Sequence, residues 1–392
     1  MKPMQFERLK SLLSCPTAPF RESLVIAEVE TQLHAASAPY FYDQHGNIVV
    51  GVASEKDYKK ILNQRSKEPV RVFIAHMDHP GFHGVQWLNE SRLAIKWFGG
   101  SPIKHVTGSK VWLASDDGAI CEGVLRKVVL RKDKRAISTA EVALDKRVNK
   151  NTKITATKIF GGFSFRTPVW QSGKRIYTRA ADDLTGVFAI LETARQLFRR
   201  TGKTKANKRP PFIGLLTRGE EVGFVGAVAH LESGLLNKAT RPVVAISLEA
   251  SRTLPGAIIG KGPVVRLGDW RTVFESSGLK VLSDLAMKLL PNKHQRRVMD
   301  GGSCEATAMT AWGVKTIGIS LPLGNYHNEG YEGGMDCLKH LGPAPEFVHL
   351  DDIEGELKLC QGLMQSNLEW DDPWQQQRSR LRKNLKSHQR YL

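Results

Sequence analysis

Four short apolar runs, each bounded by polar residues, most constrain how this chain of 392 residues folds. They are 70–75, 211–217, 243–248 and 316–320. Runs of about four to eight apolar residues with polar ends are typical of central strands in a sheet covered on both faces. Segments with helical spacing of apolar residues alternate with these runs. We expect two helices within residues 1–40 and others at Leu184–Phe198, Val225–Leu236, Val281–Leu290 and Ile353–Leu368. The pattern predicts an α/β fold.

Between residues 86 and 172 this alternation gives way to short strand-like runs separated by turns, which predicts a small β domain. Since a single core stops growing at about 250–300 residues, more than one domain is expected. We therefore assign residues 1–85 and 173–370 to a discontinuous catalytic domain, residues 86–172 to the insert, and residues 371–392 to a basic tail. The tail is either mobile or a short surface helix.

The chain is strongly basic, with 57 Lys and Arg against 39 Asp and Glu, a net charge of +18. The positive charge is concentrated at 126–135, 199–209 and 378–390. No zinc-finger or RNA-binding signature accompanies these stretches. We expect solvated basic surfaces that bind nucleic acid only non-specifically.

Two further features concern location. No apolar run approaches the roughly 20 residues of a membrane span, so no membrane partner is expected, and the early charges Glu7 and Lys10 disfavour a signal peptide. The five cysteines are scattered without a CxxC pair. This usage is typical of the reducing cytoplasm, and it argues against a thiolate zinc site.

Histidines and carboxylates stand where the predicted strands and loops end. They are His76 and Asp78, Asp182 and Asp183, Glu220 and Glu221, Glu249, and His327. Loops at the carboxyl ends of strands converge on one edge of an α/β sheet. Imidazole and carboxylate ligands without thiolates suit a catalytic divalent metal, and this set exceeds the three protein ligands of one catalytic zinc. The pattern therefore favours a pair of ions that share a carboxylate.

Each element alone has a simpler interpretation. A single histidine near a strand end is usually a satisfied polar residue, and two adjacent glutamates usually begin a solvated helix. Asp182 and Asp183 before a helix could be ordinary N-capping residues. The metal hypothesis rests on the joint occurrence of these residues at strand ends.

Three segments then resemble a known family. The motifs HMDHPGF (76–82), AADDLTG (180–186) and EEVGFVGA (220–227) are similar to those of the tetrahedral, deblocking and glutamyl aminopeptidases, dinuclear-metal exopeptidases of metallopeptidase clan MH. Weaker matches lie at 43–51, 259–266 and 318–328, so the resemblance covers residues 5–368. It implies a zinc-peptidase-like fold: a mixed central sheet covered by helices, with an inserted β-barrel-like domain. It also implies a cytoplasmic enzyme.

The resemblance assigns a role to each candidate residue. Asp182 would bridge two ions, with His76 and Glu249 completing the shell of one ion and Glu221 and His327 that of the other. Glu220 would be the general base, and Asp78 would orient His76. Asp183 matches a position that usually follows a cis peptide bond.

The implied reaction is removal of N-terminal residues from short peptides by hydroxide attack at two divalent ions per subunit, zinc or alternatively cobalt. Family members assemble from dimers into twelve-subunit shells, which predicts self-association. Acidic peptides would be favoured if 126–135 lines such a shell.

The chain departs from the family pattern in its substrate-contacting loops, which leaves its side-chain preference open. His79 and residues 301–305 and 324–326 replace more usual residues, while Glu249 stands where Asp is commoner. Two alternatives remain. The same ligands would serve a clan-related deacylase of N-acyl amino acids or peptides. The charge would also fit a non-catalytic polyanion-binding protein on a peptidase scaffold.

Overall fold

A computed structural model describes residues 1–145, 154–199 and 210–392. Its main body is an eight-stranded mixed sheet. The strands follow the order β1 (Tyr40–Tyr42), β2 (Ile48–Val50), β12 (Phe212–Thr217), β3 (Val70–His76), β13 (Val243–Arg252), β16 (Lys315–Leu323), β14 (Val264–Asp269) and β15 (Gln295–Met299). The four strands from β12 to β16 are mutually parallel, so their carboxyl ends lie along one edge. All four predicted runs are strands of this sheet.

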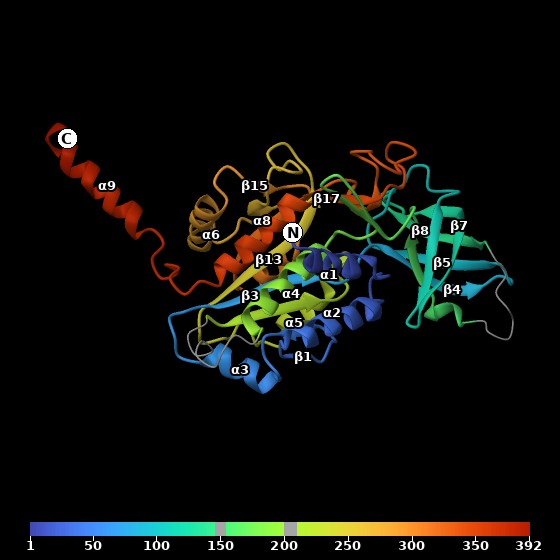
Figure 1. The fold of residues 1–392 in the computed structure, drawn as a ribbon, viewed down its shortest axis with the longest axis horizontal. Coiled ribbons are helices and arrows are strands. Elements are labelled where there is room, and N and C mark those ends of the chain that lie inside the picture. Colours follow the sequence, from blue (N-terminus) through green and yellow to red (C-terminus); the bar gives the residue numbers. More distant parts are fainter. Residues whose placement is uncertain (146–153, 200–209) are drawn as a thin grey trace.

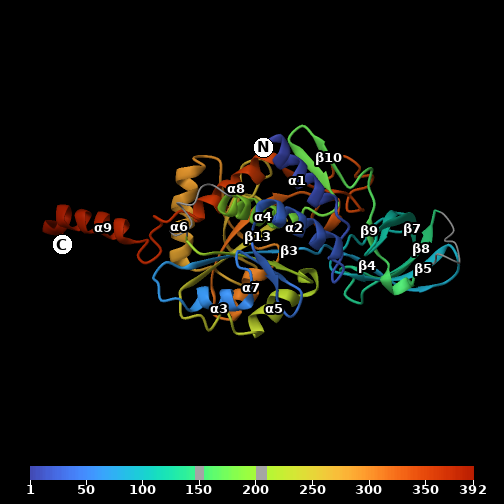
Figure 2. The same cartoon turned by 60° about the horizontal axis from the view of Figure 1, so that its bottom comes forward.

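Helices cover both faces of the sheet (Figures 1 and 2). One face carries α1 (Pro3–Ser14), α2 (Ser23–Ala36), α4 (Leu184–Phe198), α6 (Ser276–Leu289) and α8 (Leu350–Leu363). The other face carries α3 (Glu55–Asn63), α5 (Val225–Glu232) and α7 (Glu305–Ala311). Strand β3 explains the two layers, because Phe73 and Ala75 pack in the first core while Val72 and Ile74 pack in the second. The side chains of a strand point alternately to its two faces, and here both faces are apolar.

A closed six-stranded barrel lies at one end of the molecule (Figure 1). Its strands are β4 (Gly81–Trp87), β5 (Arg92–Phe98), β8 (Ile137–Leu144), β7 (Gly118–Leu130), β6 (Lys110–Ser115) and β9 (Phe160–Phe163). The interior is a separate core that includes Phe82, Trp97 and Phe163. The predicted fold class, a helix-covered mixed sheet with a small β barrel, is confirmed.

A three-stranded sheet follows the barrel: β10 (Val169–Ser172), β11 (Arg175–Thr178) and β17 (Glu346–His349). It brings the chain after the barrel beside a segment almost 170 residues further on, Thr178 lying opposite Glu346. This pairing matters for the site, because Glu346 lies next to it.

Some helix bounds differ from the sequence prediction. Helix α5 ends at Glu232, and α8 runs from Leu350 to Leu363 instead of Ile353–Leu368. The start of α8 is set by His349, whose side chain accepts a hydrogen bond from the main-chain N–H of Asp351.

The tail forms a helix, α9 (Gln375–His388), which projects from the end opposite the barrel (Figure 1). Most of the predicted basic stretch at 199–209 lies outside the described residues. Among the described residues, no helix combines the length and apolarity needed to cross a membrane.

Candidate metal centre

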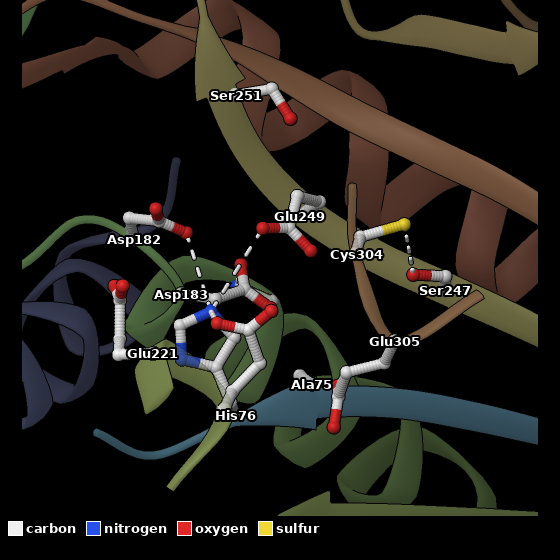
Figure 3. Close-up of polar contacts among 12 residues, drawn as sticks. Ala75, His76, Asp182, Asp183, Glu221, Ser247, Glu249, Ser251, Cys304 and Glu305 are labelled. Carbon is white, nitrogen blue, oxygen red and sulfur yellow. Dashed lines mark hydrogen bonds and ion pairs between the residues drawn. The ribbon is translucent and has the colours of Figure 1, made fainter. Parts of the chain in front are cut away.

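Five segments meet at the carboxyl ends of the parallel strands, and Figure 3 shows His76, Asp182, Glu221 and Glu249 from four of them. His76 ends β3, and Glu249 lies near the end of β13. Glu220 and Glu221 form a short turn after β12, Asp182 lies in the loop before α4, and His327 lies in a turn after β16. The structure thus brings together all the strand-end residues predicted as metal ligands or general base.

The nitrogen and oxygen atoms of the cluster face one another. His76 Nε2 lies 3.4 Å from Asp182 Oδ1, 3.8 Å from Glu220 Oε2 and 3.9 Å from Glu249 Oε1. His327 Nε2 lies 3.1 Å from Glu221 Oε2 and 3.8 Å from Asp182 Oδ2. Asp182 therefore lies between the two histidines.

The facing atoms fit divalent cations. Buried polar atoms without a hydrogen-bond partner include His76 Nε2, Asp182 Oδ1, Glu221 Oε1, Glu249 Oε2 and His327 Nε2. Buried polar atoms are normally paired, so five such atoms in one place call for an explanation, and a bound ion is one.

In the described part of the chain, two groups of side chains come close enough to hold an ion. One is His76, Glu220 and Glu249, and the other is His76, Asp182 and Glu221. These groups overlap with the predicted shells without reproducing them, since His76 belongs to both and His327 to neither.

The electrostatics of the cluster favour added positive charge. Burial is the main cause that raises the pKa values of Glu220, Glu221 and Glu249, and neighbouring carboxylates raise them further. Burial alone would lower the pKa of His76, but nearby carboxylates, Glu220 first, raise it well above its ordinary value. The cluster thus tends to retain protons that cations would replace.

Asp78 accepts hydrogen bonds from the turn that contains Glu220 and Glu221. Its Oδ1 accepts the main-chain N–H of Glu220 at 2.9 Å, and its Oδ2 accepts that of Glu221 at 3.1 Å. The Nδ1 of His76 instead faces the main-chain carbonyl of Asp78 at 3.0 Å, with Oδ1 further away at 3.7 Å. A donor at Nδ1 leaves Nε2 free to face the carboxylates, so Asp78 orients His76 mainly through its main chain.

A second buried carboxylate, which sequence reasoning missed, holds the same turn. Glu22 Oε1 accepts the main-chain N–H of Gly219 at 3.1 Å, and Oε2 accepts Arg218 Nε at 2.8 Å. Together with Asp78, it binds the N–H groups of three consecutive residues. No motif marked Glu22, because it lies in the loop between two amphipathic helices.

Glu346 was also missed, and His79 was noted only as a departure from the family pattern. Glu346 Oε2 accepts the N–H groups of Ala181 and Asp182, while Oε1 accepts that of His327. His79 Nδ1 faces the main-chain oxygen of Asp182 at 2.9 Å. Burial and the neighbouring His327 lower the pKa of His79 to about 4, so the ring is neutral at pH 7.

The Asp182–Asp183 peptide bond is cis, as the resemblance implies. Asp183 also caps α4, because its side chain accepts the main-chain N–H of Gly186 at 3.2 Å. The simpler interpretation of an N-capping acid therefore applies to Asp183, while Asp182 faces the cluster.

A pocket opens beside Glu249. Its lining includes the buried Arg266 and the partly buried Arg252, together with Ser251, Ser303 and Tyr326. The Nε atoms of both arginines are buried without a hydrogen-bond partner. The pocket therefore offers positive charge next to the cluster.

Comparisons with known proteins agree with this architecture. The TET1 peptidase of Pyrococcus horikoshii, described as able to assemble into a tetrahedron or a large octahedral shell, is 22% identical with a TM-score of 0.68, covering 92% of this chain and 99% of that chain. Aminopeptidase APDkam598 of Desulfurococcus kamchatkensis is 20% identical with a TM-score of 0.71, covering 94% and 96%. A TET aminopeptidase of Thaumarchaeota archaeon SCGC AB-539-E09 is 19% identical with a TM-score of 0.71, covering 94% and 99%.

At these identities the similarity establishes a shared fold. The family model for the M42 glutamyl aminopeptidases matches residues 60–332, and no curated protein matches. Fold and family together define the class of protein as a peptidase. The chain belongs to the M42 glutamyl aminopeptidase family.

Proposed function

We propose that this chain is a metal-dependent aminopeptidase that removes N-terminal residues from short peptides. The observation that carries the proposal is the convergence of unpartnered buried atoms from His76, Asp182, Glu221, Glu249 and His327. Family membership supports peptidase chemistry, and two histidines with several carboxylates and no thiolate suit catalytic zinc, or alternatively cobalt.

We assign the five ligands as the family resemblance implies. Asp182 would be shared between two ions, with His76 and Glu249 holding one ion and Glu221 and His327 holding the other. When bound, such ions acidify a water and polarise the substrate carbonyl.

The remaining residues of the site move and position groups. Glu220, with its raised pKa, is the general base: it takes a proton from the attacking water and delivers it to the departing amine. Asp78 holds the main chain of Glu220 in place, so that this carboxylate keeps its position while its protonation changes. Arg252 and Arg266 add positive charge beside Glu249, which would draw acidic peptides towards the centre by long-range attraction.

The broader organisation follows from the same proposal. We propose that the sheet and its helices form the catalytic domain and that the barrel is an insert in it. Structural relatives described as tetrahedral, octahedral or dodecameric support self-association of this chain as well. A cytoplasmic location stays a prediction.

The test is hydrolysis of matched unblocked and N-acetylated peptides that begin with Glu, Asp, Leu or Lys. Metal-stripped protein should be inactive and should recover with zinc or cobalt, releasing N-terminal residues from the unblocked set. The Glu220→Gln variant should lose about a hundredfold or more in kcat while still binding two ions. Glu7→Gln, on the exposed surface, is the matched control.

Three outcomes would contradict the proposal. Cleavage confined to the acetylated peptides would identify a deacylase. Activity that survives both metal removal and Glu220→Gln would reject the assigned centre. Metal binding without turnover of either peptide set would leave the non-catalytic scaffold.

A further inference from the structure

Helix α9 is the least integrated element of the described chain. None of its residues is buried, and it projects from the body at the end opposite the barrel (Figures 1 and 2). The contacts near its start are Arg378 with Asp372 and Lys280 Nζ at 5.8 Å from the ring centre of Trp374. Isolated helices of this length are marginal in water, so α9 would gain stability from a partner.

The charge of this segment is of one sign. From Pro373 to the last residue there is no Asp or Glu. The basic residues are Arg378, Arg380, Arg382, Lys383, Lys386 and Arg390. At 3.6 residues per turn, the five within α9 spread over an arc of about 200°. The helix therefore presents cations on most of its circumference.

The rest of the circumference holds a narrow apolar stripe beside polar residues. Leu381 and Leu385 lie four residues apart on one side of α9 and are 55% and 51% exposed. Two leucines make a smaller apolar face than helices that lie in a lipid surface normally have. A second copy of α9 would bring two sets of like charges together. Neither of these partners matches the wide basic arc.

We propose that α9 is a docking surface for nucleic acid, bound through its phosphate backbone. A polyphosphate complements a helix that carries six cations and no acid in and just after it. An α-helix also fits the major groove of B-form DNA, where phosphates line both walls and would meet both edges of the basic arc. The proposal is independent of the catalytic assignment, since α9 contributes nothing to the candidate metal centre.

The test measures binding of the full chain to a fluorescent 20-base-pair DNA duplex across a salt series. Parallel measurements use an RNA duplex and single-stranded nucleic acid. The tail variant is R378Q/R380Q/R382Q/K383Q, in which glutamine keeps a high helix propensity. The matched control, K10Q/K56Q/K60Q/K104Q, removes the same charge from exposed lysines of the body.

We expect wild-type affinity to fall linearly with salt on a log–log plot. The tail variant should bind at least tenfold more weakly, and its slope should be shallower by about 3 to 4, as expected for the loss of four phosphate contacts. The control should stay close to wild type, and the hydrolysis of peptides should be unchanged in both variants.

Three results would overturn the proposal. Equal loss in tail variant and control would assign binding to the overall charge. Absence of salt-dependent binding by the wild type would reject it outright. Binding to vesicles with anionic lipid, lost in L381S/L385S and unaccompanied by DNA or RNA binding, would identify a lipid surface as the partner.

Discussion

Glu346 accepts the main-chain N–H of His327 through Oε1 at 2.9 Å. Its other oxygen accepts the N–H groups of Ala181 and Asp182 at 2.7 and 3.2 Å. One fully buried carboxylate thus joins the two loops that carry the bridging acid and the second histidine of the proposed centre. Partners that orient ligands in this way commonly change metal affinity when they are replaced.

Glu346→Gln should therefore weaken metal binding by about 10- to 100-fold, because the amide cannot accept hydrogen bonds through both of its end groups. Titration of metal-stripped protein by calorimetry measures the effect. Glu329→Gln, in the loop between His327 and Glu346, is the matched control. Unchanged affinity with normal folding would show that the loops keep their positions without this carboxylate.

Glu22 supports the opposite side of the centre. Because it accepts the N–H of Gly219 and pairs with Arg218, Glu22→Gln should displace the turn that presents Glu220 and lower kcat by about tenfold or more, with a smaller effect on KM. Arg218→Gln and the double variant complete a thermodynamic cycle. If Arg218→Gln lowers kcat as much as Glu22→Gln does, the turn is held by the ion pair with Arg218 and not by the hydrogen bond from Gly219.

The sequence predicted the parts of the site that local patterns mark. Buried apolar strands that end in polar residues indicated His76 and Glu249, and parallel pairing of β3, β12, β13 and β16 brought their ends together. The adjacent glutamates were found in the same way, since they follow β12 directly.

The supporting residues lay beyond such reasoning. Glu346 reaches the centre because β17 pairs with β11, a contact between segments almost 170 residues apart that no local pattern encodes. Glu22 precedes α2 and acts through the main chain of a distant turn. Helix α3 was not predicted, although it has an ordinary N-cap in Ser54 and buries Tyr58 and Leu62. Most of its other residues are charged, so the few apolar residues in a short helix did not reveal the helical spacing.

The buried carboxylate of Glu356, in α8, leads to a prediction about the stability of the fold. It is fully buried, and neither of its oxygens has a hydrogen-bond partner. Burial, and after it the charge of Asp352, raises its pKa well above 4.5. Because the folded pKa exceeds the unfolded one, ionisation of this group costs no stability below about pH 4.5, and stability falls as pH rises from there towards the folded value.

Glu356→Met should remove that cost. We expect the variant to be more stable than wild type by about 1–3 kcal/mol at pH 8, with the difference shrinking towards pH 5. Urea unfolding of metal-stripped protein at both pH values measures it, and Glu7→Gln on the exposed surface is the control. A variant that is less stable at pH 8 would show that Glu356 has a stabilising partner.

Metal binding itself should release protons. The raised pKa values of Glu220, Glu221 and Glu249, with burial as the main cause, mean that the metal-free cluster keeps protons to a higher pH than free carboxylates do. Cations that take the carboxylates must displace them, so affinity should rise with pH.

Calorimetric titration with zinc at pH 6.5 in two buffers of different ionisation enthalpy gives the number of protons released. We expect more than one proton per protein, because several carboxylates and His76 share the retained protons. Glu249→Gln should reduce that number, since it removes one titrating ligand, whereas Glu7→Gln should leave it unchanged. Release of no protons, with affinity independent of pH, would mean that the carboxylates are already ionised without metal. The buried cluster would then need another source of positive charge, for which Arg266, buried and lining the same pocket as Glu249, is a candidate.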